Sequence, residues 1–321
     1  MNRIGVLTSG GDSPGMNAAV RAVVRCGIDA GMEVFGIYRG YEGLLDGEIR
    51  QLTRNDVGDI LHKGGTILKT ARSEKFMTDE GKRQAAAILD TFGIEGVVVI
   101  GGDGSLRGAR ELSEECGVTA MGLPGTIDND LGYTDYTIGF DTAVNTVLDA
   151  ISKIRDTSSS HERTFVVEVM GRNCGDIALY SGIAGGAEAV IIPEIEYNVN
   201  EICMKILSGA NRGKEHSIII NAEGSGIKSS KLVEEIETRT GRSTREVILS
   251  YIQRGGVPTN RDRWLATMTA AKAIDLLMAD SASKAIGIRD GHILAIDLNE
   301  AILTKRDIDL EAYELIGVLS K

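Results

Sequence analysis

Residues Val118-Thr-Ala-Met-Gly-Leu-Pro-Gly-Thr-Ile-Asp-Asn-Asp130 join a short apolar run to a loop that carries two carboxylates. The apolar run, Val118–Leu123, predicts a buried strand, and the Pro-Gly pair after it is expected to open the loop. Asp128 and Asp130 then lie just past the carboxyl end of a strand, where open α/β sheets bind their ligands. Two acids at this spacing can divide proton transfer and metal binding, or they can form an ordinary turn that caps the next helix.

Apolar runs of this kind alternate with amphipathic stretches along almost the whole chain. Strands are predicted at Ile4–Leu7, Val34–Tyr38, Gly96–Ile100, Thr119–Leu123, Thr164–Val169, Ala189–Ile192, Ser217–Asn221 and Ala285–Arg289. Helices are predicted at Asn17–Ala30, Asp79–Phe92, Asp141–Arg155, Asn200–Arg212, Ser229–Thr240 and Arg261–Ala279. Continuous apolar strands separated by helices indicate parallel sheets buried on both faces, so the fold class is α/β with three layers.

The composition limits the size of the fold and the kinds of partner. At 321 residues the chain fits two domains, or one large α/β domain with an appendage. Its net charge of −11 disfavours nucleic acid and anionic membranes, so an anionic substrate would need locally clustered arginines. Cys26, Cys116, Cys174 and Cys203 are widely spaced and indicate free thiols in a reducing compartment. The chain enters a strand directly and has no membrane-length apolar run, so we expect a soluble cytoplasmic protein.

Two glycine-rich segments also follow predicted strands. Ser9-Gly-Gly-Asp-Ser-Pro-Gly-Met-Asn17 leads into the first helix, and Ile100-Gly-Gly-Asp-Gly-Ser105 repeats the arrangement. Glycines let backbone N–H groups approach an oxyanion, and a helix N-terminus adds partial positive charge. Asp103 would either cap its helix or contact Mg²⁺ directly or through water. Neither segment is a P-loop or a dinucleotide fingerprint. Three such loops at three strand ends favour a phosphoryl-transfer site.

The chain resembles the bacterial ATP-dependent 6-phosphofructokinases from Met1 to about residue 300. The resemblance rests on motifs in family order: Gly10-Gly-Asp-Ser-Pro-Gly-Met-Asn-Ala18, Gly65-Thr-Ile-Leu68, Thr70-Ala-Arg-Ser73, Gly101-Gly-Asp-Gly-Ser105, Pro124-Gly-Thr-Ile-Asp-Asn-Asp130, Ser160-His-Glu-Arg163, Val169-Met-Gly-Arg172, Ala222-Glu-Gly224 and Gln253-Arg-Gly-Gly256. It implies two Rossmann-like three-layer α/β/α domains with mostly parallel sheets. The larger, ATP-binding domain would span 1–139 plus 252–302, and the smaller, sugar-phosphate-binding and subunit-interface domain 140–251 plus 303–321.

The resemblance implies transfer of the γ-phosphate of ATP to the 1-hydroxyl of fructose 6-phosphate, giving fructose 1,6-bisphosphate and ADP. Asp128 would be the general base, and Asp103 would hold Mg²⁺, with Asp130 as a candidate for a second, water-mediated contact. The catalytic residues would surround the transferring group: Gly11, Arg72, Thr126, Asp128 and Arg172. Such a site works by positioning and electrostatics, as phosphoryl transfer requires.

The same resemblance implies two sets of substrate contacts. ATP would be bound by Gly11, Tyr41, Arg72, Ser73, Gly102, Asp103, Gly104, Ser105 and Gly108, with Phe76 close to the adenosine. The sugar phosphate would be bound by Thr126, Ile127, Asp128, Arg163, Met170, Gly171, Arg172, Glu223, Arg245, Tyr251, Ile252, Gln253 and Arg254. Arg163 and Arg245 would reach across a subunit interface to the 6-phosphate, which an arginine can bind bidentately. Tyr251 stands where the family usually has His, so weaker acceptor binding is expected.

The phosphoryl donor follows from two glycines. Gly104 and Gly125 leave room beyond the β-phosphate, whereas pyrophosphate-dependent relatives typically carry Asp and Lys there, so ATP is favoured. Other interpretations are a pyrophosphate-dependent phosphofructokinase and a catalytically silent subunit that senses sugar phosphate or nucleotide. A nicotinamide-nucleotide or lipid kinase is disfavoured by the loop at 127–130, and an oxidoreductase by the missing dinucleotide fingerprint.

A second anion site is implied between subunits of a homotetramer, with ADP as activator and phosphoenolpyruvate as inhibitor. The residues that match the family's effector site are Arg21, Val24, Arg25, Arg54, Asp59, Arg155, Gly186, Ala187, Glu188, Arg212, Lys214, Glu215 and His216. From the residues alone, Arg21 and Arg25 share a helix face that could simply be solvated. The stretch 212–216 could likewise be a helix C-terminus with favourable dipole charges.

Overall fold

The computed structural model describes residues 1–159 and 163–320 and divides the chain into two compact units. Unit 1 comprises Met1–Ile127, Leu131–Thr142 and Arg254–Arg306. Unit 2 comprises Asp128–Asp130, Ala143–Gln253 and the C-terminal segment from Asp307. The junctions differ by a few residues from those expected from the sequence, and the segment 128–130 belongs to unit 2 instead of the larger unit. Which ligand each unit binds stays a prediction.

Unit 1 is built on a mixed sheet with a parallel centre. Its strands are β1 (Arg3–Ser9), β2 (Glu33–Ile37), β3 (Ile49–Leu52), β4 (Gly96–Gly101), β5 (Thr119–Thr126), β6 (Ile138–Gly139), β11 (Lys284–Arg289) and β12 (His292–Asp297). They lie in the order β12-β11-β5-β4-β1-β2-β3, and β6 pairs with β5. The edge strands β3 and β12 are antiparallel to their neighbours, whereas β2, β1, β4, β5 and β11 are parallel. The predicted mostly parallel α/β fold is confirmed.

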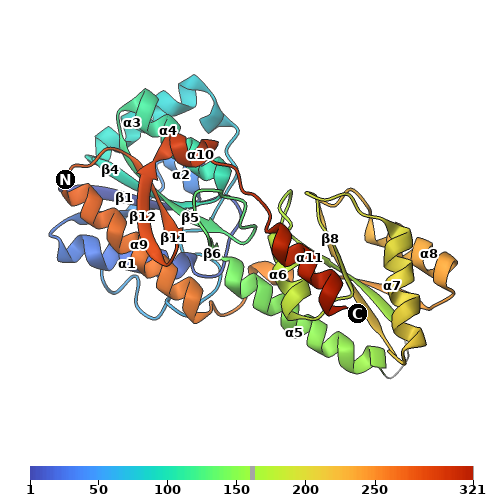
Figure 1. The fold of residues 1–321 in the computed structure, drawn as a ribbon. Helices are drawn as coiled ribbons and strands as arrows, with labels where there is room; N and C mark the ends of the chain where they lie inside the picture. The colour runs from blue at the N-terminus through green and yellow to red at the C-terminus, as the bar shows by residue number, and fades with distance from the viewer. Residues whose placement is uncertain (160–162, 321) are drawn as a thin grey trace. The chain divides into compact units, whose positions relative to one another are not determined.

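Helices cover both faces of this sheet, as Figure 1 shows. The helices of unit 1 are α1 (Met16–Asp29), α2 (Gly40–Leu45), α3 (Asp79–Phe92), α4 (Asp103–Cys116), α9 (Asn260–Met278) and α10 (Leu298–Leu303), with a 3₁₀ turn η1 (Lys75–Met77). On β4, Val98 and Ile100 face α1 and α9, whereas Val97 and Val99 face the other helices. Because successive strand residues point to opposite faces, a continuous apolar strand is buried on both sides.

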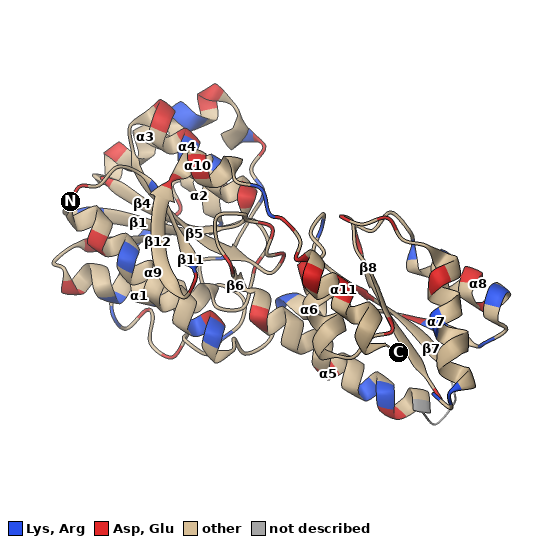
Figure 2. Cartoon of the chain, viewed as in Figure 1, with Lys and Arg blue, Asp and Glu red and all other residues tan. Residues whose placement is uncertain are grey.

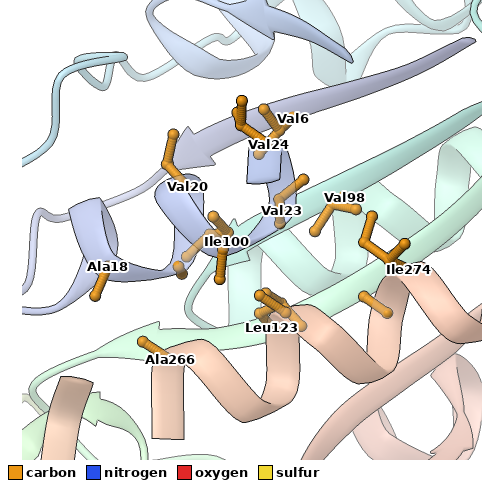
Figure 3. Close-up of a cluster of buried hydrophobic side chains, with 14 of the residues drawn as sticks. Val6, Ala18, Val20, Val23, Val24, Val98, Ile100, Leu123, Ala266 and Ile274 are labelled. Atoms are coloured by element: carbon orange, nitrogen blue, oxygen red, sulfur yellow. The ribbon is translucent and has the colours of Figure 1, made fainter. Parts of the chain in front are cut away.

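The layer between α1, α9 and the sheet is filled by aliphatic side chains (Figure 3). Val20, Val23 and Val24 of α1 and Ile274 of α9 lie against strand residues such as Leu123, and all are at most 2% exposed. Burial of such side chains stabilises the fold by about 1.5–3 kcal/mol each. This layer fixes the strand ends that carry the candidate site of unit 1.

Unit 2 contains a smaller, wholly parallel sheet. Its strands β7 (Thr164–Val169), β8 (Ala189–Ile191), β9 (Ser217–Ala222) and β10 (Thr244–Ile248) lie in the order β10-β7-β9-β8. Its helices are α6 (Asp176–Ala184), α7 (Val199–Asn211), α8 (Ser229–Thr240) and α11 (Leu310–Leu319), with a 3₁₀ turn η2 (Ser250–Arg254). α7 and α8 pack on one face of the sheet, and α6 contacts β8, β9 and α11. Helix α5 (Phe140–Ser159) begins in unit 1 and continues in unit 2.

The expectation that Pro124 opens the loop after the strand was wrong. This residue does not open the loop, because β5 continues through it to Thr126. Its neighbour β11 pairs only with Met121 and Gly122, so a residue without an N–H group loses no bond on that side. From Gly125 onward the short strand β6 takes the place of β11. The candidate loop therefore starts three residues later than the Pro-Gly pair suggested.

Charged residues of both signs are spread over the helices of each unit (Figure 2). Among the residues that the structure describes, no helix combines the length and the apolar character needed to cross a membrane. All four cysteines are free thiols, of which Cys174 and Cys203 are buried.

Candidate active site

The three loops singled out in the sequence follow three neighbouring parallel strands. β1 lies next to β4, and β4 lies next to β5, so the segments after Ser9, Gly101 and Thr126 leave the same edge of the unit 1 sheet. A methyl group at Gly102 would lie 3.4 Å from Cβ of Thr126, so the second loop touches the end of β5. The three strands therefore end at one edge of the unit 1 sheet, as expected.

The helices that follow the first two loops begin without a side-chain cap. Gly15 caps α1 and Gly102 caps α4, and neither helix N-terminus receives a side-chain hydrogen bond. By contrast, Thr78 and Thr259 cap α3 and α9 through their hydroxyl groups. Helix N-termini with free N–H groups and a positive dipole end attract phosphate. Both termini are therefore available to an anionic ligand.

Arg254 lies directly on the first glycine loop within unit 1. Its Nη1 donates a hydrogen bond to the backbone oxygen of Asp12 at 3.2 Å. A methyl group at Gly11 would lie 2.3 Å from the same nitrogen, so a side chain at residue 11 would displace the guanidinium. The structure thereby places one expected acceptor residue beside one expected phosphate-loop residue.

Asp103 is the first residue of α4 and the candidate metal ligand. Its carboxylate is 38% exposed and pairs with Nε of Arg107, one helical turn later, at 2.8 Å. Within the described ranges there is no group of three or more His, Cys, Asp and Glu side chains placed to hold a metal ion. Mg²⁺ in phosphoryl-transfer sites is usually held by one or two carboxylates together with substrate phosphates. A single accessible carboxylate at a phosphate-binding helix N-terminus fits that mode of binding.

The candidate adenosine neighbours form a packed aromatic pair. The rings of Tyr41 and Phe76 stack with centroids 4.2 Å apart, and both side chains are buried. The Tyr41 hydroxyl donates to the backbone oxygen of Ser105 at 2.7 Å, and burial raises the pKa of this phenol, so it stays a neutral donor. A methyl group at Gly108 would lie 2.6 Å from the Tyr41 ring. These residues thus support the first turn of α4.

The remaining nucleotide candidates lie on an exposed segment before η1. Arg72 has an exposed side chain, and the Ser73 hydroxyl accepts a hydrogen bond from the backbone N–H of Phe76 at 3.2 Å. Ser73 thus organises the turn that carries Phe76.

The two glycines used to infer the donor differ in their surroundings. A Cβ atom at Gly104 would meet nothing within 4 Å. At Gly125 it would lie 2.9 Å from Cγ2 of Ile100 and 3.1 Å from the backbone nitrogen of Gly101. Packing alone accounts for Gly125, so only Gly104 bears on which donor fits.

In unit 2 the candidate base is paired with the candidate charge-neutralising arginine. Nε of Arg172 lies 3.2 Å from Oδ2 of Asp128, whose side chain is only 2% exposed. Arg172 has a φ of 52°, and Glu223 Oε1 accepts hydrogen bonds from its backbone N–H at 2.8 Å and from that of Gly171 at 3.2 Å. A methyl group at Gly224 would lie 1.9 Å from the Arg172 carbonyl oxygen. Glu223 therefore fixes the backbone that presents Arg172 to Asp128.

A contact that the sequence did not reveal holds the loop between the two acids. Asn129, with a φ of 53°, donates from Nδ2 to Oδ2 of Asp176 at 2.7 Å. Asp176 is a buried residue in the first turn of α6. The thiol of Cys174, whose pKa is raised by burial and by Asp176, lies 3.8 Å from the Asn129 carbonyl oxygen. These contacts anchor the segment 128–130 in unit 2.

Several other expected acceptor residues pack or support the backbone. Ile127 and Gln253 are fully buried. Gln253 accepts from the Met170 backbone N–H at 3.2 Å and donates to the Ser250 backbone oxygen at 3.0 Å. Tyr251 and Ile252, by contrast, are 77% and 59% exposed. Direct contact with a ligand through the side chains of Ile127 and Gln253 is therefore not supported.

Arg163 and Arg245 are not brought to this site within the chain. Arg163 immediately precedes β7, and Arg245 is the second residue of β10, so both lie at the amino end of the unit 2 sheet. Met170 and Glu223 follow β7 and β9 at the opposite, carboxyl end. At about 3.3 Å per strand residue, roughly 23 Å of strand separates Arg163 from Met170. The first three residues of the motif Ser160-His-Glu-Arg163 lie outside the described residues.

The unit 2 members of the expected effector site form a compact cluster. Nη1 of Arg155 lies 3.0 Å from Nε2 of His216, and its Nη2 donates to the Gly186 backbone oxygen at 2.7 Å. Lys214 forms an ion pair with the buried Glu188. Burial, and next the nearby Arg155, lowers the pKa of His216, which favours the neutral ring. Because arginine only donates, Nε2 of His216 acts as the acceptor.

The other effector candidates are placed less uniformly. In unit 1, Arg25 and Arg54 line an open cavity of about 610 Å³ between α1 and α9. Arg54 also pairs with Asp29 at 3.0 Å. Val24 is fully buried in the hydrophobic core, so its side chain is not positioned to contact an effector. The remaining candidates are Arg21 on α1, Asp59 with a φ of 52°, buried Ala187, Arg212, whose Nη1 donates to Ser208, and Glu215, whose backbone oxygen accepts from Arg242.

Uncapped helix N-termini beside an aspartate, and a buried aspartate held by an arginine, are features of phosphoryl transfer. The fold and these residues define the class of α/β phosphotransferases. Residues 3–277 match the family described as phosphofructokinase, and the chain belongs to this family.

Two bacterial relatives match this chain over their full length. The chain is 57% identical over 321 residues to an ATP-dependent 6-phosphofructokinase of Clostridium botulinum strain Loch Maree, with all of both chains covered. It is 57% identical over 320 residues to the protein of the same description from Clostridium tetani, again with 100% of each covered. The structure of phosphofructokinase from Saccharomyces cerevisiae superimposes with a TM-score of 0.90 and 37% identity, over 98% of this chain and 50% of the yeast chain. The predicted family is therefore confirmed.

Proposed function

We propose that this protein transfers the γ-phosphoryl group of ATP to the 1-hydroxyl of fructose 6-phosphate, giving fructose 1,6-bisphosphate and ADP. The observation that carries the proposal is the pairing of Asp128 with Arg172, a buried acid beside a half-exposed cation. Uncapped N-termini of α1 and α4 at the carboxyl edge of the other sheet support a polyphosphate donor. The full-length similarity to proteins described as ATP-dependent 6-phosphofructokinases supports the choice of both substrates.

In this mechanism Asp128 accepts the proton of the sugar hydroxyl as that oxygen attacks the γ-phosphorus. The bond from phosphorus to the β–γ bridging oxygen breaks, and ADP leaves with the electron pair. Arg172 and Arg72 neutralise the charge on the equatorial oxygens, and the Gly11 amide and the Thr126 hydroxyl donate hydrogen bonds to them. Preorganised donors of this kind contribute about 3–4 kcal/mol each when tested by removal.

Asp103 is the residue of this chain that would hold Mg²⁺. The ion, when bound with the donor phosphates, supplies charge neutralisation of the leaving group. Asp103 is accessible, and the ion pair with Arg107 is partly exposed, so exchange of Arg107 for a metal ion costs little free energy. Asp130 is a candidate for a water-mediated second contact.

The acceptor is bound by Glu223, Arg254 and the backbone of Met170 and Gly171, with a 6-phosphate beyond them. The arginines expected to bind that phosphate lie at the opposite edge of their own sheet, as described above. We therefore infer that a second copy of the chain supplies them, which makes the active form a homo-oligomer, and we propose a tetramer. Arginine suits this role because its planar donors bind phosphate bidentately.

We further propose that ADP and phosphoenolpyruvate regulate the enzyme through the basic clusters of α1 and of the segment 212–216. The proposal is supported by the adjacency of Arg155, His216 and Lys214 in unit 2 and of Arg25 and Arg54 in unit 1. Each of the single variants Arg21→Ala, Arg25→Ala and Arg212→Ala should weaken the response to both ligands. Unchanged responses in all three variants would refute the assignment of the effector site.

Because ATP and sugar phosphates are metabolites of the cell interior, and all four thiols are free, we place the enzyme in the cytoplasm.

The deciding experiment is a coupled assay of fructose 1,6-bisphosphate formation with ATP or with pyrophosphate as donor. Activity is expected with ATP and Mg²⁺ only, and Asp128→Asn should lower kcat by at least about a hundredfold. The matched control is Asp90→Asn, an exposed acid on α3, which should keep full activity. Turnover with pyrophosphate alone would favour the pyrophosphate-dependent alternative, and ligand binding without turnover would favour a sensor subunit.

A further inference from the structure

Asp262, on the first turn of α9, is a buried carboxylate with no part in the mechanism above. Its side chain is 1% exposed. Oδ1 accepts a hydrogen bond from the backbone N–H of Gly139 at 2.8 Å. Oδ2 accepts from the backbone N–H of Thr142 at 2.8 Å and from its hydroxyl at 2.5 Å. One carboxylate thus binds both the end of β6 and the first turn of α5.

The same contacts cap two helices at once. The Thr142 hydroxyl accepts from the backbone N–H of Thr259 at 3.0 Å, and the Thr259 hydroxyl accepts from the backbone N–H of Asp262 at 3.3 Å. In an ordinary capping box the acid would bind the cap residue of its own helix. Here Asp262 instead binds Thr142 at the start of α5, which is 120 residues away in sequence. The backbone N–H of the cap residue Thr259 is bound by the Thr142 hydroxyl in place of the Asp262 carboxylate. The start of α5 is therefore fastened to the start of α9.

β6 connects this cluster to a loop of the candidate active site. Gly139 pairs with Thr126 in the parallel ladder between β6 and β5. The hydroxyl of Thr137 donates to the Thr126 backbone oxygen at 2.7 Å. Thr126 has no direct neighbour on β11, whose pairing with β5 covers only Met121 and Gly122. The position of Thr126 accordingly depends on β6.

The first glycine loop packs against β6 and Asp262. A methyl group at Gly139, whose φ is 109°, would lie 2.6 Å from Cβ of Ser13. A methyl group at Gly15 would lie 2.7 Å from Cγ2 of Ile138 and 3.5 Å from Cβ of Asp262. β6 is thus packed between the first phosphate-binding loop and α9, with too little space for a side chain at either glycine.

We propose that Asp262 is a positioning residue for phosphoryl transfer: it holds β6 in place, and β6 in turn sets the positions of Thr126 and of the loop from Ser13 to Gly15. This inference rests on the proposed function, because Thr126 is taken there to bind the transferring group. Asp262 touches no substrate. A misplacement of about 1 Å in such a site lowers the rate by about a hundredfold.

The test uses near-isosteric variants of the full-length protein. Asp262→Asn keeps the shape but replaces one acceptor oxygen with a donor, so either Gly139 or Thr142 loses its partner. Thr142→Val removes the hydroxyl that links Asp262 to Thr259, and Thr142→Ser restores it. The matched control is Thr269→Val, which removes a buried hydroxyl of α9 that bonds only within its own helix, to the backbone oxygens of Leu265 and Ala266.

Two measurements are made on each variant. Steady-state kinetics should show kcat about ten- to a hundredfold lower in Asp262→Asn and Thr142→Val, with Thr142→Ser and Thr269→Val close to wild type. Amide hydrogen exchange should show at least tenfold faster exchange confined to peptides covering 10–16 and 125–142. A purely structural role would instead accelerate exchange throughout unit 1 and lower kcat only in proportion to the loss of folded protein.

Wild-type kcat in Asp262→Asn, or exchange that increases uniformly through unit 1, would overturn the inference. An inactive wild-type protein would instead refute the proposed function. In that case the exchange measurement still decides whether Asp262 holds β6, because local protection does not depend on turnover.

Discussion

Arg172 lies with its Nε atom 3.2 Å from Oδ2 of Asp128, and the two partners differ sharply in exposure. The aspartate side chain is 2% exposed, whereas the arginine side chain is 54% exposed. A buried acid is thus held by a cation whose side chain is about half exposed. Because the backbone of Arg172 is fixed by Glu223, only its side chain can turn from the acid toward a phosphoryl group.

Replacement of Arg172 by lysine tests whether the planar guanidinium is needed for both duties. Lysine keeps the charge but lacks the planar fork of donors with which arginine binds a phosphoryl group bidentately. We expect kcat to fall by about a hundredfold with unchanged thermal stability. The control is Arg239→Lys, since Arg239 also pairs with a nearby acid, Glu235, at 2.9 Å, but lies on α8. Equal kcat values in the two variants would contradict a role of Arg172 in neutralising the transferring phosphoryl group.

Gly104 offers a direct test of donor choice, because a side chain fits there without a clash. An aspartate at this position would place a negative charge in the first turn of α4, where the phosphates of ATP are expected, although the helix itself would tolerate it. We expect Gly104→Asp to raise the KM for ATP at least tenfold, by charge repulsion, while Gly104→Ala changes it less than about threefold. Coupled assays over a range of ATP concentrations measure both. Similar KM values in the two variants would show that charge at residue 104 does not govern donor binding.

The sequence was sufficient to find the loops but not the contacts that hold them. Asp103 and Asp128 could be singled out because each follows a continuous apolar strand, and parallel strands end at one edge of a sheet. Asp262 could not, because its partner Gly139 is 123 residues distant in sequence and binds through its backbone. The edge strands were missed for a related reason: β12 is mostly half-exposed, so its sequence lacks the apolar continuity of a central strand.

Tyr251 replaces the histidine usual in the family and is 77% exposed, so substitution there should not disturb packing. Tyrosine can donate one hydrogen bond but carries no positive charge at neutral pH. We expect Tyr251→His to lower the KM for fructose 6-phosphate severalfold, more so at pH 6 than at pH 8, because the unperturbed imidazole titrates near pH 6.5. Tyr197→His, at an exposed residue in the segment between β8 and α7, is the control and should leave this KM unchanged. A KM that stays the same or rises in Tyr251→His would refute a phosphate contact at residue 251.

The ionisation of Asp262 predicts how stability depends on pH. Burial raises the pKa of this carboxyl to about 6, against the hydrogen bonds from Thr142 and Gly139, which lower it, and with a further increase from the charge of Asp141. The unfolded chain has a pKa near 3.9 at this residue, so between about pH 4 and pH 6 the folded protein binds more protons than the unfolded one. The stabilising contribution of the protonated Asp262 carboxyl is therefore complete below pH 4 and is lost as the pH rises through 6. The change amounts to about 3 kcal/mol.

The comparison that isolates this contribution is between wild type and Asp262→Asn, because all other titrating groups are shared. Asparagine cannot ionise, so the free energy of unfolding of wild type minus that of the variant should decrease by up to about 3 kcal/mol from pH 4 to pH 6.5. Urea unfolding of both proteins at a series of pH values measures it. A difference that grows with pH would mean that the charged form stabilises the fold. Suppose that this difference decreases as the pH rises and that kcat falls in Asp262→Asn as expected. The two results together would show that the buried charge of Asp262 at neutral pH serves to position Thr126 and does not stabilise the fold.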